Sequence, residues 1–146
     1  MGSLTSLYYH IVFSTKHRDT ILVGPIKPVV FKVFRNVAEK YNATIIAANG
    51  VDDHVHILLK MDTSQFVVDV IKEMKRLSSL IVNKTFETRF YWQRHYGIFS
   101  VSYSMVPTVK AYVCNQQEHH KKNDFLTELS QYASLTNELI DNDLYE

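Results

Sequence analysis

Near its start the chain shows a regular alternation of apolar and polar positions. Large apolar or aromatic side chains occupy every second position from Leu7 to Phe13, and this period of two is typical of a β-strand. From about Pro25 the spacing changes, because apolar residues recur three and four positions apart as far as about Tyr41. That is the period of an amphipathic helix. The pattern therefore predicts a strand followed by a helix.

The middle of the chain has the pattern of two strands and a second helix. Residues 44–51 and 54–61 are strand-like, and the short polar segment between them suits a hairpin turn. We therefore expect these two strands to pair antiparallel. Thr63 or Ser64 can cap the helix that follows, whose apolar stripe continues to Ile81.

The remaining part of the chain predicts a loop, a fourth strand and further helices. Residues 85–96 show no clear period and read as a loop, whereas 98–103 is rich in aromatic, β-branched and Ser residues, as strands are. Ser104 can cap a helix that has Pro107 in its first turn and continues to about Lys122. An amphipathic segment follows. Its apolar residues are Phe125, Leu126, Leu129, Tyr132, Leu135 and Leu139.

The predicted order of elements is β-α-β-β-α-β followed by terminal helices. This is the split βαβ arrangement called ferredoxin-like. We therefore expect an α+β fold, in which an antiparallel four-stranded sheet has helices on one face and the later helices are added to it. With 146 residues and a mass of 17.0 kDa, the chain has the size of one domain, spanning 1–146.

Charge and cysteine content narrow the expected partners and location. Sixteen Lys and Arg against fifteen Asp and Glu leave a formal charge of +1, so only local basic patches would hold a nucleic acid. The single cysteine, Cys114, favours a reducing cytoplasm. No segment approaches the ~20 apolar residues of a membrane span, and no signal-peptide pattern is found at the N-terminus. The sequence predicts a cytoplasmic protein without a membrane partner.

The most informative candidate chemistry lies in the strand predicted over 54–61. Because successive side chains of a strand point to opposite faces, His54 and His56 would share one face, opposite Val55 and Ile57. No helix need cover that face, and two neutral imidazoles one pleat apart can bind one divalent metal ion. The alternative is that both are ordinary half-exposed strand residues. A third ligand is needed for the metal interpretation.

A candidate third ligand lies on the helix predicted after the fourth strand. Tyr112 and Gln116 are four residues apart and would share a helical face, with His119 about one turn further along. A carboxamide oxygen can ligate Mg²⁺ or Mn²⁺, and a nearby phenol can attack a phosphorus atom that the metal polarises. Taken alone, Tyr112 is better explained as a core or surface residue of an amphipathic helix.

Several motifs occur in order along nearly the whole chain. They are His10-Ile-Val-Phe-Ser-Thr-Lys16, Asp53-His54-Val55-His56, Trp92-Gln93 followed by Tyr96-Gly97 and Phe99-Ser100-Val101-Ser102, and the most specific one, Tyr112-Val-Cys-Asn-Gln116-Gln-Glu-His119-His120-Lys121. In these motifs the chain resembles the single-tyrosine HUH transposases of bacterial insertion sequences, the group called TnpA or IS-two-hundred-like. Two positions depart from the pattern: His95 stands where a small residue is expected, and Thr20 where many relatives have Pro.

The resemblance implies both an activity and the residues that carry it. His54 and His56, the HUH pair, would bind a divalent metal, Mg²⁺ or Mn²⁺, together with Gln116, and Tyr112 would be the nucleophile. Such enzymes act on single-stranded DNA with hairpin ends: the tyrosine attacks a scissile phosphate, forms a 5′-phosphotyrosine link and releases a 3′-OH that later rejoins strands. The family is dimeric, with the tyrosine helix of one subunit completing the metal site of the other.

DNA binding by such an enzyme would require local basic groups. The candidates are Lys16, His17, Arg18, Lys72, Lys75, Arg76, Lys121 and Lys122. For each of them, a solvated surface is the alternative to a phosphate contact. Trp92 and Tyr96 either stack on an unpaired base or pack into the core.

Two other interpretations of the whole chain stay open. One is a host-adopted, non-mobile relative of the transposases. The other is a non-catalytic nucleic-acid-binding module with the same ferredoxin-like sheet, which would need exposed aromatic residues on its two central strands. The third strand presents His54 and His56 instead, which favours the enzyme.

Overall fold

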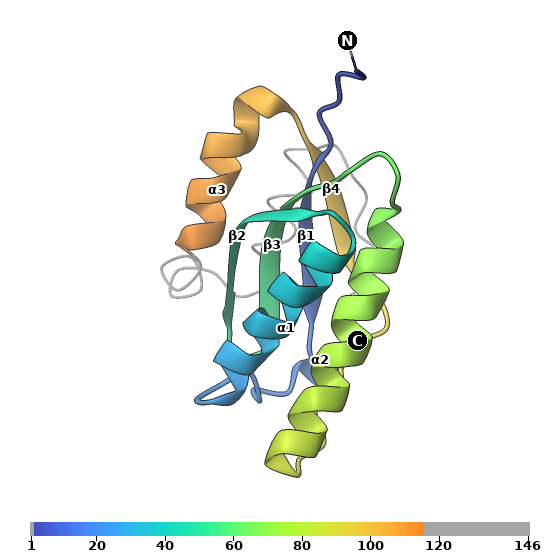
Figure 1. Ribbon diagram of the computed structural model, residues 1–146. Coiled ribbons are helices and arrows are strands. Elements are labelled where there is room, and N and C mark those ends of the chain that lie inside the picture. Colours follow the sequence, from blue (N-terminus) through green and yellow to red (C-terminus); the bar gives the residue numbers. More distant parts are fainter. Residues whose placement is uncertain (1, 116–146) are drawn as a thin grey trace.

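The computed structural model describes residues 2–115, and these form an α+β fold around one four-stranded sheet (Figure 1). The strands are β1 (Tyr8–Ser14), β2 (Thr44–Val51), β3 (His54–Lys60) and β4 (Gly97–Val101). The helices are α1 (Ile26–Lys40), α2 (Val67–Phe86) and α3 (Val106–Cys114), and two short 3₁₀ turns are η1 (Lys16–Arg18) and η2 (Tyr103–Met105). The sheet order is β2-β3-β1-β4 with every neighbouring pair antiparallel, so the ferredoxin-like prediction is confirmed.

Helices α1 and α2 cover one side of the sheet, which we call the helical face. Alternate residues of the two central strands, among them Phe13 and Ile57, point to this side and are buried. Phe34 of α1 and Met74 of α2 are buried against them. The apolar stripes read from the sequence are therefore the surfaces that form the main core.

Helix α3 covers the opposite side of the sheet, which we call the α3 face. Its buried residues Val109 and Val113 pack with Leu58 of β3 and Val101 of β4. Leu58 alternates with the strand residues that point to the helical face, so this second cluster lies on the other side. The prediction of helices on one face holds for α1 and α2, and α3 adds a layer on the opposite face.

Helix α2 begins and ends later than the sequence pattern predicts. Ser64 does not cap it, because its Oγ donates to Asp62 Oδ2 at 2.6 Å in a local turn. The helix starts at Val67 without a side-chain cap. It continues to Phe86, so it includes the first residues of the segment predicted as a loop.

Helix α3 is preceded by a turn that the sequence pattern did not predict. Ser104 lies inside η2 and makes no cap for the helix, which starts at Val106 with Pro107 in its first turn. The predicted continuation to Lys122 and the amphipathic segment after it lie outside the described residues. Between residues 2 and 115, no helix combines the length and the apolar character needed to cross a membrane.

Candidate active site

Strand β3 brings His54 and His56 to the α3 face of the sheet. Their ring centroids are 5.2 Å apart, and they share a face as the alternation predicts. Both side chains are buried, with exposed fractions of 0% and 2%, so the expectation of an uncovered face is wrong. Helix α3 packs across β2 and β3 on this side of the sheet and places Tyr112 against the ring of His56.

Each of these imidazoles has its Nδ1 atom held by a neighbouring side chain. His54 Nδ1 lies 2.7 Å from Asp53 Oδ1, and His56 Nδ1 lies 2.8 Å from His10 Nε2. Histidines that bind metals commonly use their other ring nitrogen in such a bond, which fixes the ring and its tautomer. The donor set therefore fits a divalent ion held through the Nε2 atoms of His54 and His56.

The third predicted ligand, Gln116, lies outside the described residues. Within the part of the chain that the structure describes, no three His, Cys, Asp or Glu side chains gather as a metal site. The described residues thus offer two imidazole ligands, and the role of Gln116 stays a prediction.

Helix α3 places Tyr112 against the rings of His56 and His10. The centroid of its ring lies 5.7 Å from that of His56 and 5.7 Å from that of His10, and the phenol meets both rings nearly edge-on. All three residues belong to one chain. The two parts of the sequence motif, on β3 and on α3, are therefore neighbours in space.

The position of α3 is fixed along its length and at its end. Val109 and Val113 anchor its buried side. At the C-terminal end, Asn49 Nδ2 of β2 donates to the carbonyl oxygen of Cys114 at 3.0 Å. This bond satisfies one of the carbonyls that a helix end leaves without an intrahelical partner. The bonded residue, Cys114, follows Tyr112 by two positions.

The turn η1 connects the site to two of the basic residues predicted to bind DNA. The backbone N and the Oγ1 of Thr15 donate to the carbonyl oxygen of Asp53, at 2.8 and 3.2 Å. Because η1 begins at the next residue, Lys16 and Arg18 lie at the end of the sheet that carries His54. Arg18 has a φ of 53°, an uncommon left-handed conformation that recurs at functional sites.

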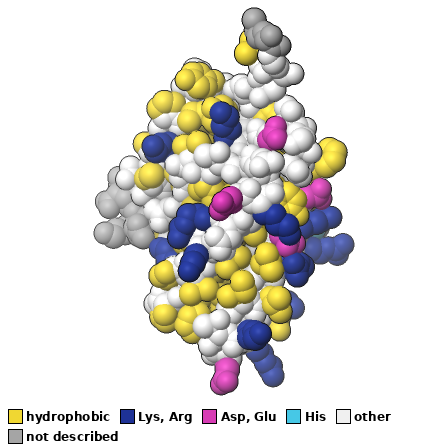
Figure 2. Space-filling model, in the orientation of Figure 1, with side chains coloured by type: hydrophobic (Ala, Val, Ile, Leu, Met, Phe, Trp, Pro, Cys, Tyr) yellow, Lys and Arg dark blue, Asp and Glu magenta, His cyan; other side chains and the backbone are white. Residues whose placement is uncertain are grey.

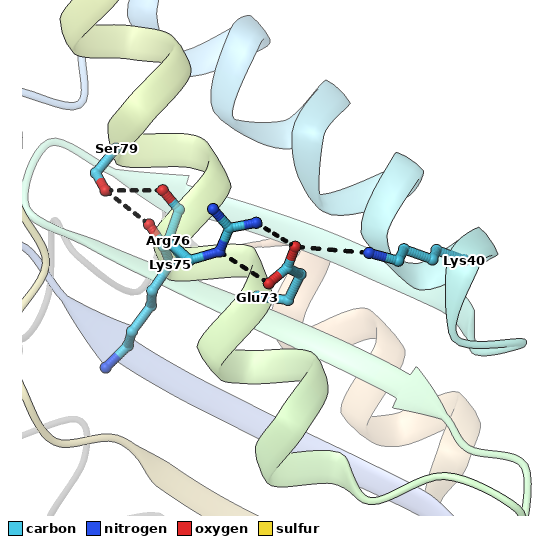
Figure 3. Close-up of polar contacts among 5 residues, drawn as sticks. All are labelled: Lys40, Glu73, Lys75, Arg76 and Ser79. Atoms are coloured by element: carbon cyan, nitrogen blue, oxygen red, sulfur yellow. Dashed lines mark hydrogen bonds and ion pairs between the residues drawn. The ribbon is translucent and has the colours of Figure 1, made fainter.

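Lys72 and Arg76 lie on α2, on the opposite side of the sheet. Figure 2 views this helical face, where Lys and Arg side chains lie among apolar patches. Arg76 donates two hydrogen bonds to the Glu73 carboxylate, of 3.1 and 2.7 Å, and Lys40 of α1 pairs with it at 3.7 Å (Figure 3). The bonds from Arg76 lower the pKa of Glu73. The structure therefore does not bring these candidates to the imidazoles, and Lys121 lies outside the described residues.

Lys75 also does not act as an exposed basic group. Its Nζ donates to the carbonyl oxygens of the three consecutive residues 93–95, at 2.8, 3.4 and 2.8 Å. It lies 5.0 Å from the ring centroid of Phe13 and 5.4 Å from that of Tyr96. Burial lowers the pKa of Lys75 to about 8. The lysine holds the segment before β4 in place, and Tyr96 and Trp92 both pack against the core.

Sequence reasoning missed the side chains that support the histidine pair. His10 and Asp53 were part of the motifs, but no role was predicted for either. Asp53 is recognisable as a carboxylate directly next to the first histidine. His10 carries a weaker signal, a polar residue within an apolar strand, and only the pairing of β1 with β3 shows that it lies near His56.

Comparison with known protein families decides what kind of protein carries this site. Residues 3–116 match the family described as "Transposase IS200 like". The chain belongs to the IS200-like transposase family. The resemblance drawn from the motifs is thereby confirmed. An IS200-like transposase is a DNA-processing enzyme, which makes the imidazole and tyrosine cluster its candidate active site.

Individual relatives agree with this family. The transposase is 24% identical over 124 residues to the ISDra2 transposase TnpA of Deinococcus radiodurans, a match that covers 80% of this chain and 89% of that protein. It is 28% identical over 126 residues to the transposase for insertion sequence element IS200 of Salmonella typhimurium, covering 82% of each protein.

Solved structures share the fold. A crystal structure of a proposed transposase from Deinococcus radiodurans R1 matches with a TM-score of 0.65 at 24% identity, covering 80% of this chain and 95% of that one. The structure of a REP-associated tyrosine transposase bound to a REP hairpin also matches with a TM-score of 0.65, at 11% identity, covering 82% and 72%. The fold of this IS200-like transposase is therefore that of other transposases.

Proposed function

We propose that this IS200-like transposase cleaves and rejoins single-stranded DNA at hairpin ends through a covalent bond to Tyr112. The observation that carries the proposal is the meeting of Tyr112 with the rings of His56 and His10, next to His54, on one buried face of the sheet. A nucleophile thus lies beside His56, one of the proposed metal ligands. A transposase of the same fold is bound to a REP hairpin, which supports hairpin DNA as the substrate.

Tyr112 would act as the nucleophile in a reversible exchange of phosphodiester bonds. Its Oη attacks the scissile phosphorus and gives up its proton, because a neutral phenol, with a reference pKa of ~10, is a weak nucleophile. The bond from phosphorus to the 3′ oxygen breaks, and that oxygen takes up a proton to become a 3′-OH. The 5′-phosphotyrosine link keeps the energy of the bond, so a 3′-OH reverses the step without ATP.

The cofactor proposed for this site is Mg²⁺ or Mn²⁺, held by His54, His56 and Gln116. When bound, such an ion stabilises negative charge on the phosphoryl oxygens and on the leaving 3′ oxygen. The hydrogen bonds at the Nδ1 atoms of His54 and His56 support this assignment, because they orient both rings for ligation through Nε2.

The deciding experiment traps the covalent intermediate. The protein is incubated with single-stranded hairpin DNA from its own element and Mn²⁺, and the adduct is mapped by mass spectrometry. We expect DNA on Tyr112, no adduct from Tyr112→Phe, and a normal adduct from Tyr41→Phe, which changes a tyrosine at the end of α1. DNA binding without any adduct would identify the non-catalytic alternative, and an adduct that persists in Tyr112→Phe would reject the mechanism.

The basic residues that we propose to contact the DNA are those nearest the site. Lys16 and Arg18 belong to η1, which directly follows Thr15, and Thr15 is hydrogen-bonded to the carbonyl oxygen of Asp53. Their charges would neutralise phosphates of the strand that enters the site. Lys121 is retained as a candidate from its place in the sequence, whereas Lys72 and Arg76 lie on the helical face.

We further propose that the enzyme is a homodimer of single-domain subunits acting in the cytoplasm. Tyr112 lies beside His56 of its own chain, which supports an active site within one subunit, and the site shared between subunits that the resemblance implies stays a prediction. Mixing Tyr112→Phe with His54→Ala subunits distinguishes the two. Cleavage by the mixed dimer indicates a shared site, and no cleavage by a confirmed mixed dimer indicates a site within one subunit.

A further inference from the structure

His10 is a fully buried polar residue of β1 that the proposed chemistry does not use. It lies on the α3 face with an exposed fraction of 0%. In the register of β1 with β3 it stands opposite Leu58, and the residue two positions along, Val12, stands opposite His56. His10 and His56 are therefore diagonal neighbours on one face, at a separation that aromatic rings can bridge.

The two rings are in direct contact. His10 Nε2 lies 2.8 Å from His56 Nδ1, and the rings stack with centroids 5.1 Å apart and an angle of 26° between their planes. Since both histidines are buried, this hydrogen bond is formed in a low-dielectric environment, where it holds the rings more firmly than it would in water.

We propose that His10 is a positioning residue that fixes the tautomer and orientation of His56 for metal binding, an inference that rests on the proposed function. A neutral imidazole carries one N–H, so ligation of a metal through Nε2 of His56 requires the proton on Nδ1. The Nδ1–H group of His56 then donates a hydrogen bond to His10 Nε2. Asp53 accepts a hydrogen bond in the same way from Nδ1 of His54. A carboxylate therefore orients one proposed ligand, and an imidazole orients the other.

His10 also contacts the nucleophile. Its ring lies 5.7 Å from the Tyr112 ring at 76°, so one side chain touches both His56 and Tyr112. A leucine would fill part of the same volume, but it cannot accept a hydrogen bond. Positioning and simple packing therefore predict different consequences for substitutions at this residue.

The test compares metal affinity in three variants without DNA. Mn²⁺ binding is followed by the electron paramagnetic resonance signal of the free ion. We expect His10→Leu to bind Mn²⁺ about 10- to 100-fold more weakly, and His10→Gln, whose Oε1 can accept, to recover most of the affinity. Tyr8→Phe, on the same strand and face, is the matched control and should bind like the wild type. Unchanged affinity in His10→Leu would overturn the inference.

A second measurement uses the unaltered protein, so it does not depend on how well a variant folds. ¹⁵N NMR of the histidine rings, with and without Mg²⁺, is expected to show the His56 proton on Nδ1, bonded to His10. A proton on Nε2 in the metal-free protein overturns the role of His10.

The variant His54→Ala separates the role of His10 from the proposed metal site. If His54→Ala leaves Mn²⁺ binding unchanged, the proposed metal pair itself is wrong. If His54→Ala loses binding and His10→Leu does not, only the role of His10 fails.

Discussion

The buried histidines show how single residues combine stability with chemistry. A buried polar group that loses its hydrogen bond costs ~1–3 kcal/mol. His54 and His56 are buried on the α3 face, and each is bonded to a neighbouring side chain through Nδ1. The contacts that make their burial tolerable are also the ones that orient their rings, so the fold and the candidate metal site depend on the same bonds.

The carboxylate of Asp53 should therefore control metal affinity. In Asp53→Ala, His54 loses the acceptor that orients its ring, and we expect metal affinity to fall about 10- to 100-fold. Isothermal titration calorimetry with Mn²⁺ measures this change in metal affinity. Asp52→Ala removes the neighbouring exposed carboxylate and serves as the control. Equal losses in the two variants would show that general negative charge, and not the bond to His54, is responsible.

Lys75 should give the protein a stability that rises with pH above about 8. Its pKa is lowered by burial from 10.5 to about 8, so between these values the unfolded chain keeps a proton that the folded protein has lost. The unfolded state then binds more protons, and this group's contribution to the free energy of unfolding increases by at most about 1.4 kcal/mol per pH unit. Below pH 8 both states are protonated and the contribution is constant.

Urea unfolding of the wild type and of Lys75→Met at several values between pH 7 and 10 tests this dependence. The difference in unfolding free energy between the two proteins should rise with pH in favour of the wild type. Lys72→Met, an exposed lysine one turn earlier on the same helix, should show no such trend relative to the wild type. A difference that stays flat with pH would contradict the linkage.

At the scale of elements, the hydrophobic periodicity of the sequence predicted those strands and helices that bury one face. The four strands and the helices α1 and α2 agree with the predicted elements to within a few residues, because alternation and helical spacing directly record which side chains are covered. The predicted start of α2 was wrong, because Ser64 donates its hydrogen bond to Asp62 and does not cap the helix. Local hydrogen-bonding choices of this kind are not visible in apolar periodicity.

The candidate site was predictable only where its parts lie within one element. His54 and His56 share a face because of strand alternation alone, and Tyr112 was identified through a motif. The burial of the pair and the support from His10 depend on the packing of α3 and on the pairing of β1 with β3. These are contacts between distant segments, which single-chain periodicity does not encode.

Docking of α3 should control the rate at which Tyr112 reacts. Asn49→Ala removes the hydrogen bond from β2 to the last turn of the helix. We expect adduct formation to slow about 2- to 12-fold, equivalent to about 0.5–1.5 kcal/mol, while metal affinity stays unchanged. Single-turnover cleavage assays measure the rate. Asn36→Ala, an exposed position on α1, is the control, and a slower rate in both variants would argue against a specific role for the docking bond.

At the scale of the whole molecule, the described candidates for DNA binding lie in two different places, on η1 and on α2. With a formal charge of +1, overall attraction to DNA is weak, and specific groups must contribute most of the binding. On the helical face, Arg76 and Lys40 are paired with Glu73. At the end of the sheet next to His54, η1 carries Lys16 and Arg18. This arrangement favours a DNA strand on the side of α3.

The salt dependence of DNA binding can separate these two faces. Each phosphate contact on a single strand contributes ~0.7 to the slope of log K against log salt concentration, so Lys16→Gln with Arg18→Gln should lower the slope by about 1.4. Lys72→Gln with Arg76→Gln removes the same charge from the helical face and should leave the slope unchanged. Fluorescence anisotropy with a labelled hairpin at several salt concentrations measures both. If the helical-face variant lowers the slope as much as the η1 variant, the DNA contacts both faces and the placement of the strand beside α3 is wrong.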